Sequence, residues 1–208
     1  TIDDSFADAY IFRNGFCPNH ADIQLRKKNL LGGWKTVRDS CPNCDQERRH
    51  NQGASTTSIP SPIAKILSKM RMNERNANIQ EEGCSELRNL AYNNENNQVT
   101  IAEAGGITTI LSAMKTHSSN ATVQENGCGA LANLALNENN KVTISEAGGI
   151  TTILSAMKTH SSNATVQENG CGALANLALN ENNKVTISEA GGITTILSAM
   201  KTHSSNAT

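Results

Sequence analysis

A long stretch of this chain occurs twice without a change, and no other feature restricts the fold as strongly. Residues 103–165 recur as residues 146–208, so the chain repeats with a period of 43 residues. A more distant copy precedes them, because residues 61–91 match residues 105–135 with an offset of 44. Repeats of this length are typical of proteins in which similar units stack, so that each unit buries its apolar face only against its neighbours.

Each period contains three segments with helical patterns. The first, near residues 139–147, is followed by two glycines, which can adopt the left-handed C-cap conformation at little cost. The second, about residues 149–158, carries apolar residues at positions i, i+3, i+4 and i+7, which form one apolar stripe. The third begins with Asn163 or Thr165 as its N-cap and runs to about residue 179. The sequence therefore predicts a three-helix unit.

The segment QENGCGALANLALNENNKVTISEAGGITTILSAM is similar to the third, first and second helices of the armadillo family, in that order. The resemblance covers residues 61–208 and depends on the repeat length, the paired glycines and the ALxNLA motif. A two-helix repeat of the HEAT kind explains the period nearly as well, but not the glycines. The resemblance implies an all-α fold, an armadillo-type right-handed superhelix whose third helices line a concave face. The expected units are a partial repeat at 61–93, repeats at 94–137 and 138–180, and a truncated repeat at 181–208.

One asparagine recurs in the third helix of each repeat, at Asn89, Asn133 and Asn176. In the armadillo family this asparagine forms a row whose amides bind the backbone of an extended peptide, so the resemblance implies a peptide-binding role. Packed helices lie roughly 8–10 Å apart and a strand rises about 3.3 Å per residue, so each repeat would contact two to three peptide residues. The alternative is that these asparagines only bridge adjacent repeats, and both interpretations stay open.

Family members that bind basic targeting peptides carry Trp one turn before this asparagine. This chain has Ser85, Gly129 and Gly172 there, so it lacks the rings that would hold a Lys stem. We therefore do not expect nuclear import signals as ligands. The recurring cysteines Cys84, Cys128 and Cys171 occupy one repeat position and are expected to be buried as small hydrophobic residues without chemistry.

The first 50 residues contain two paired sets of metal-binding residue types. The sets have the form C-x2-H and C-x2-C, and two chelating pairs at this separation suit one tetrahedral structural zinc ion. The predicted ligands are Cys17, His20, Cys41 and Cys44. Short strands near Ile23 and Trp34 would complete a module that resembles a zinc ribbon, followed by a polar linker at residues 51–60. The alternative is reduced cysteines with an incidental histidine.

The charge of the chain does not favour one class of partner. The formal net charge is -1, and acidic residues are interspersed among the basic residues of the first module, so nucleic-acid binding through Lys27 and Lys28 is a minority hypothesis. The sequence shows no phosphate-binding glycine loop, nucleophile elbow or paired catalytic carboxylates, so we expect no enzyme. A ubiquitin-ligase adaptor is a weaker alternative, because a RING needs eight ligands for two ions.

These patterns predict a protein-interaction scaffold that binds a protein or peptide partner on its concave face. The sequence contains no apolar run of the roughly 20 residues that span a membrane and no signal peptide, so we expect an intracellular protein in the cytoplasm, the nucleus or both. The chain begins without Met and stops within a repeat, from which we expect a fragment. The last repeat would then expose an apolar face and self-associate or fray.

Overall fold

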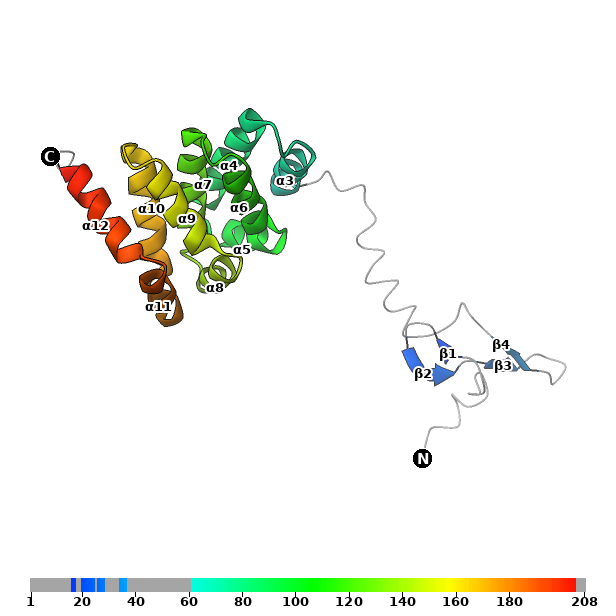
Figure 1. Ribbon diagram of the computed structural model, residues 1–208. Coiled ribbons are helices and arrows are strands. Elements are labelled where there is room, and N and C mark those ends of the chain that lie inside the picture. Colours follow the sequence, from blue (N-terminus) through cyan, green and yellow to red (C-terminus); the bar gives the residue numbers. More distant parts are fainter. Residues whose placement is uncertain (1–15, 18–19, 25, 29–33, 37–60, 205–208) are drawn as a thin grey trace. The chain divides into compact units, whose positions relative to one another are not determined.

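The computed structural model describes residues 61–204 and four short strands between residues 16 and 36 (Figure 1). The chain divides into two units, Thr1–Ile59 and Pro60–Thr208, and each is considered by itself. In the first unit the strands are β1 (Phe16–Cys17), β2 (His20–Gln24), β3 (Arg26–Lys28) and β4 (Trp34–Thr36). They form two antiparallel pairs, β1 with β2 and β3 with β4.

The strand register bears on two of the four predicted zinc ligands. Cys17 on β1 is the backbone partner of His20 on β2, so these two residues lie opposite each other. Their side chains, together with Cys41 and Cys44, lie outside what the structure describes. Zinc binding therefore stays a prediction.

The described part of the second unit consists of helices only. They are α3 (Pro62–Met72), α4 (Ala77–Ala91), α5 (Glu95–Glu103), α6 (Gly106–Thr116), α7 (Ala121–Leu134), α8 (Glu138–Glu146), α9 (Gly149–Thr159), α10 (Ala164–Leu177), α11 (Glu181–Glu189) and α12 (Gly192–Thr202). Helices α5, α8 and α11 are the predicted first helices of the repeats, α3, α6, α9 and α12 the second, and α4, α7 and α10 the third. None of the described helices is long and apolar enough to cross a membrane.

The helix boundaries follow from the capping residues that the sequence repeats. A glycine with positive φ separates the first helix of a unit from the second, with φ of 75° at Gly105, 78° at Gly148 and 79° at Gly191. These values lie in the left-handed region, where glycine has no Cβ clash. Asn163 is the N-cap of α10, and its side chain accepts a hydrogen bond from the N–H of Val166. The predicted glycine caps are confirmed, and of the two predicted N-caps of the third helix, Asn163 is the one that the structure has.

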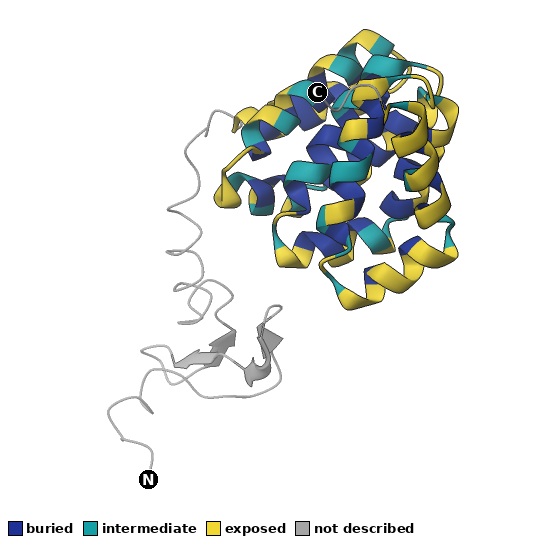
Figure 2. Cartoon of the chain, turned by 90° about the vertical axis from the view of Figure 1, so that its left-hand side faces the viewer, coloured by how far each residue is buried: buried dark blue, intermediate teal, exposed yellow. Residues whose placement is uncertain are grey.

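The core lies between the helices and is shared by neighbouring units (Figure 2). Helices α3, α6 and α9 each pack against the third helix that follows them, and the glycines inside the third helices permit this contact. A Cβ built on Gly170 would lie 2.6 Å from Met157 Cγ, and the same arrangement joins Gly127 to Met114. Glycine inside a helix costs about 1 kcal/mol of stability relative to Ala, and the close packing of the two helices offsets this cost.

Burial of the recurring cysteine differs along the chain. Cys84 and Cys128 are fully buried, whereas Cys171 is only half-buried. Cys128 lies on a third helix that has another third helix on each side, while among the described residues no third helix follows α10. The prediction that Cys171 is buried like its counterparts is therefore wrong.

Candidate partner-binding surface

The three third helices provide the broadest continuous surface with repeated features. Helices α4, α7 and α10 lie side by side, and the contacts of α7 with its two neighbours are the most extensive in the helical unit (Figure 1). We define the third-helix surface as the side chains of these helices, and of the turns that directly follow them, that are not buried. This surface contains all three asparagines predicted to bind peptide.

The predicted asparagines bridge successive third helices. The Nδ2 of Asn133 donates a 2.9 Å hydrogen bond to the carbonyl of Arg88, and the Nδ2 of Asn176 donates one of 2.9 Å to the carbonyl of Ala132. Asn89, on α4, is exposed. Asn133 and Asn176 therefore each use one side-chain N–H to bridge adjacent repeats, as the bridging interpretation predicts. No hydrogen bond among the described residues uses their Oδ1 atoms, so peptide binding by this row stays a prediction.

A row of exposed apolar side chains accompanies the asparagine row. Tyr92, Leu136 and Leu179 follow Asn89, Asn133 and Asn176 by three residues and keep 65%, 48% and 68% of their surface exposed. We call these three side chains the apolar row. The prediction from sequence missed it because Leu136 and Leu179 directly follow the ALxNLA motif and are not part of it. The sequence signal that could have revealed the apolar row is a large apolar residue that recurs at one repeat position outside the buried stripe.

The position where related proteins carry Trp differs from repeat to repeat. At Gly129 the side chain of Arg88 crosses α7, because a Cβ on this glycine would lie 2.6 Å from Arg88 Nε. The Nη2 of Arg88 donates to Asn169 Oδ1 at 3.4 Å, and Asn169 Nδ2 donates to the carbonyl of Glu125 at 3.1 Å. Arg88 therefore links α4 to α10 across α7. At Gly172, by contrast, a Cβ would meet no described heavy atom within 4 Å.

Comparison with known families agrees with this geometry. The family model described as LRRK2 ARM repeat matches residues 44–208. The chain belongs to this family. The match confirms the armadillo-type (ARM) repeat predicted from the sequence, and it supports a repeat scaffold for protein interaction. No curated protein sequence matched the chain.

The turns between the second and third helices of the ARM repeats are also joined to one another. The histidines of these turns are all half-buried, and each contacts a backbone carbonyl of the preceding turn. The contacts are His117 Nε2 to Glu74 O at 2.8 Å, His160 Nε2 to Ser118 O at 2.8 Å and His203 Nε2 to Ser161 O at 2.9 Å. These histidines hold neighbouring ARM repeats in register. Within the described residues, no three His, Cys, Asp or Glu side chains are placed to hold a metal ion together.

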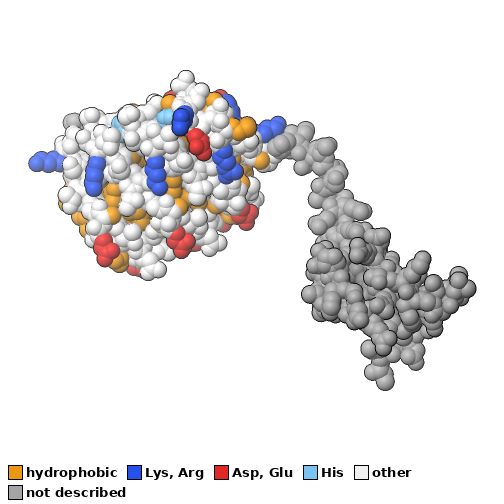
Figure 3. Space-filling model, turned by 45° about the vertical axis from the view of Figure 1, so that its right-hand side comes forward, with side chains coloured by type: hydrophobic (Ala, Val, Ile, Leu, Met, Phe, Trp, Pro, Cys, Tyr) orange, Lys and Arg blue, Asp and Glu red, His pale blue; other side chains and the backbone are white. Residues whose placement is uncertain are grey.

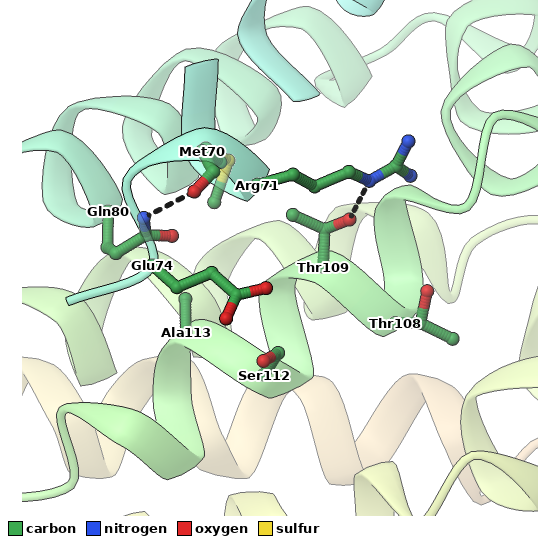
Figure 4. A pocket seen from close by; sticks show the side chains of 8 residues that line it. All are labelled: Met70, Arg71, Glu74, Gln80, Thr108, Thr109, Ser112 and Ala113. Atoms are coloured by element: carbon green, nitrogen blue, oxygen red, sulfur yellow. Dashed lines mark hydrogen bonds between the residues drawn. The ribbon is translucent and has the colours of Figure 1, made fainter. Parts of the chain in front are cut away.

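A small recess lies between each pair of neighbouring second helices. The recess between α3 and α6 has a volume of about 260 Å³ (Figure 4). Arg71 Nε donates to Thr109 Oγ1 at 3.1 Å there, and Gln80 Nε2 donates to the carbonyl of Met70 at 2.9 Å. Equivalent recesses of about 280 Å³ lie between α6 and α9 and between α9 and α12. Because they recur at every junction and fall below the usual ligand-pocket range of about 300–1,000 Å³, we attribute them to ARM repeat packing.

Charges are spread along the ARM repeats instead of forming one strong patch. Helices α6, α9 and α12 each carry one Lys and no acidic residue, whereas α5, α8 and α11 each begin and end with Glu. In the view of Figure 3, Lys and Arg side chains accordingly stand at intervals along the helical unit. Because α6, α9 and α12 carry only one Lys each, the apolar row and the asparagines distinguish this surface for recognition more than its charges do.

Proposed function

We propose that the chain is a non-enzymatic scaffold that binds a segment of a partner protein, extended or helical, on the third-helix surface. The observation that carries the proposal is the apolar row, Tyr92, Leu136 and Leu179. A single exposed Leu is ordinary, but a large apolar side chain exposed at the same position of three successive repeats makes a regular series of contacts for a partner. Desolvation of this row would supply affinity.

The asparagine row would add orientation to that affinity. Asn133 and Asn176 use one N–H each to bridge repeats, which fixes the amide plane and leaves Oδ1 to accept a hydrogen bond from a partner's N–H. With repeats roughly 10 Å apart, an extended segment would align every third residue with the apolar row, at about 3.3 Å per residue. A helix would align every seventh residue, at about 1.5 Å per residue.

The test compares the apolar row with the basic residues of the first module. The variant Leu136→Ser with Leu179→Ser removes two exposed apolar contacts, and the control variant Lys27→Ala with Lys28→Ala removes charge. Partners captured by the unmodified chain are identified by mass spectrometry, and their affinity for each variant is then measured by titration. We expect a loss of tenfold or more for the leucine variant, equivalent to about 1.4 kcal/mol, and no loss for the control. Thermal unfolding of each variant shows whether the fold is preserved.

The opposite pattern would overturn the proposal. A partner that binds the leucine variant normally, loses affinity for the lysine variant and dissociates steeply as salt rises would indicate nucleic-acid binding through the first module. Substitution of Asn133 and Asn176 by Ala is a weaker test, because it also removes the bridges between the third helices.

For the first module we propose one structural zinc ion held by Cys17, His20, Cys41 and Cys44. The chemistry of the donor set suits tetrahedral zinc, and the pairing of Cys17 with His20 across β1 and β2 supports a chelating pair. Four protein ligands leave no open coordination position, so the ion would stabilise the module rather than catalyse a reaction. Metal analysis of the purified chain tests this: we expect one zinc per chain, lost in Cys41→Ser.

We further propose that the chain acts in the cytoplasm, the nucleus or both. Thiolate zinc ligands and free Cys84 and Cys128 in the helical unit are compatible with a reducing compartment. Imaging of the tagged full-length protein tests the compartment, and a secreted protein would contradict the proposal.

A further inference from the structure

The third-helix surface contains one arginine that its repeat equivalents lack. Arg88 lies one turn before Tyr92 at the end of α4, and the same repeat position holds Ala132 in α7 and Ala175 in α10. Helices α4, α7 and α10 contain no other Lys or Arg, and their remaining charged side chains are all carboxylates. Arg88 is therefore the feature that most distinguishes one third helix from the next.

The Arg88 side chain lies over α7 because Gly129 leaves the space for it. A Cβ on Gly129 would lie 2.6 Å from Nε of Arg88 and 2.8 Å from both its Cδ and its Cζ. The 3.4 Å hydrogen bond from Nη2 to Asn169 Oδ1 then fixes the end of the side chain toward α10. Arg88 is half-buried in this position. The guanidinium is thus held over the middle one of the three third helices.

Within the described residues, no carboxylate pairs with this guanidinium. The ion pairs found there all involve lysines. Glu125 lies one turn before Gly129 on α7, but its Oε1 accepts a 2.8 Å hydrogen bond from Asn163 Nδ2 instead. A guanidinium has five N–H donors, and hydrogen bonds to described residues use one of them in Arg88. Because a half-buried cation has lost part of its hydration, an anionic group gains more here than beside an exposed lysine.

The guanidinium, the asparagine row and the apolar row follow one another along α7. Asn133 comes one turn after Gly129, and Leu136 comes seven residues after it, so the three positions share one face. At about 1.5 Å per residue, Leu136 lies roughly 10 Å from Gly129. An extended segment that crosses α7 between them directs successive side chains to opposite sides. One side chain then reaches Leu136 while its neighbour reaches Arg88.

We propose that Arg88 makes the third-helix surface select partner segments in which an Asp or Glu stands beside an apolar residue. The guanidinium binds the carboxylate through two parallel N–H···O bonds, because its planar fork matches the planar carboxylate. The inference rests on the proposed function, since the apolar residue of the segment contacts the apolar row. It adds the charge of the partner, which the other side chains of these helices, all neutral or acidic, would not favour.

The test selects binders of the whole chain from a display library of random short peptides, so that no natural partner has to be known. The same selection is made with Arg88→Glu and, as a matched charge reversal on another face, with Lys158→Glu, whose lysine is exposed on α9. The unmodified chain and Lys158→Glu should enrich Asp or Glu beside an apolar position. Arg88→Glu should lose this enrichment and favour Lys or Arg there, because the surface then carries carboxylates alone.

One selected peptide then measures the pair directly. Its acidic residue is changed to the matching amide, and both peptides are titrated against the unmodified chain and against Arg88→Gln, which keeps a polar side chain without the charge. The unmodified chain should bind the amide peptide about tenfold more weakly. Arg88→Gln should bind the two peptides equally, since the coupling requires both charges. Thermal unfolding of each variant checks that the fold is preserved.

Selection without an acidic preference, or selection of no peptide at all, would overturn the inference. So would an equal loss for the amide peptide with and without Arg88. The variant Leu136→Ser with Leu179→Ser separates this failure from a failure of the proposed function. If that variant loses the selected peptides while Arg88→Glu selects as before, the apolar row binds the segment and Arg88 does not choose it. If the leucine variant selects the same peptides as the unmodified chain, the proposed function is wrong, and this inference with it.

Discussion

The units that contain α9 and α12 have the same sequence over residues 146–165 and 189–208 but different environments. Leu154 of α9 is buried while Leu197 of α12 is exposed. Burying such a side chain contributes about 1.5–3 kcal/mol, so the two copies differ in stability by several such contributions. A residue's burial here is decided by which unit follows it, because no local sequence difference exists. In a stacked-repeat protein, stability belongs to the junctions between units as much as to the units.

The comparison implies a gradient of stability along the helical unit. Opening of a terminal unit breaks one junction, whereas opening of a central unit breaks two. Helices α11 and α12 should therefore open first, and α7, which has a third helix on each side, should open last. The following substitutions test the comparison between covered and uncovered copies, in order of decreasing effect.

The largest difference is expected between Leu154→Ala and Leu197→Ala. Leu154→Ala leaves a cavity between α9 and α10 and should lower the free energy of unfolding by about 2–5 kcal/mol. Leu197→Ala removes an exposed side chain and should change it by less than about 0.5 kcal/mol. Urea unfolding of both variants provides the measurement. Similar costs at the two positions would mean that α12 is covered in solution.

The next largest effect concerns the thiols at high pH. Burial raises the pKa of the Cys128 thiol from 9.0 to about 12, with a further contribution from nearby Cys84. As pH rises, the thiol ionises in the unfolded chain before it ionises in the folded chain, and this favours unfolding. The stability that comes from burying the neutral Cys128 thiol is therefore complete below pH 9 and is lost as pH approaches 12. At pH 10.5 the loss from Cys128 should be about 2 kcal/mol.

Urea unfolding at pH 8 and pH 10.5 checks this prediction. Cys128→Ala should lose about 2 kcal/mol less between the two pH values than the unmodified chain. Cys171 has the same neighbours in sequence but is only half-buried; burial raises the pKa of its thiol too. We expect Cys171→Ala to retain more of the pH dependence than Cys128→Ala. Equal behaviour of both variants would show that the two thiols share one environment.

The sequence predicted the local structure of the repeat because the signals are local. Predicted segments at 139–147, 149–158 and 163–179 correspond to α8, α9 and α10 within one or two residues, since glycine and asparagine caps determine where the helices begin and end. The apolar stripe of α9 was also predicted as a core face, and it is one. Such features depend on residues within a turn or two of each other.

The sequence did not predict what depends on the neighbouring unit. Cys128 and Cys171 share one motif, so no sequence pattern separates the buried thiol from the half-buried one. The histidine contacts end on backbone carbonyls, which every residue has and no motif marks. The bridges from Asn133 and Asn176 also end on carbonyls, so the sequence offered bridging only as one of two interpretations. The apolar row was likewise missed, because exposure of Leu136 follows from the geometry of the stack.

The third prediction concerns the asparagine row, in which bridged and unbridged members can be compared. Asn133→Ala removes the hydrogen bond to the carbonyl of Arg88 and should lower the free energy of unfolding by about 1 kcal/mol. Asn89→Ala alters an exposed side chain and should leave stability within about 0.5 kcal/mol of the unmodified chain. Thermal unfolding measures both. A stabilised Asn133→Ala variant would argue against a structural role for the bridge.

The smallest effect is expected at the glycines of the third helices, where it should be a gain in stability. Gly172→Ala adds a methyl group that meets no described heavy atom within 4 Å, so the higher helix propensity of Ala should stabilise the chain by about 0.5–1 kcal/mol. Gly129→Ala offers the same propensity, but its Cβ would lie 2.6 Å from Arg88 Nε and displace that side chain from Asn169. The gain should therefore be cancelled at Gly129. Urea unfolding of the two single variants provides the measurement. Gly129→Ala is also compared with its parent in an Arg88→Ala background, which separates the helix propensity of Ala from the displacement of Arg88. Without Arg88, Gly129→Ala should stabilise the chain. Equal stabilisation by both single substitutions would mean that Arg88 does not cross α7 at Gly129. It would also contradict the idea that the same substitution has different effects in the identical helices α7 and α10 because their neighbours differ.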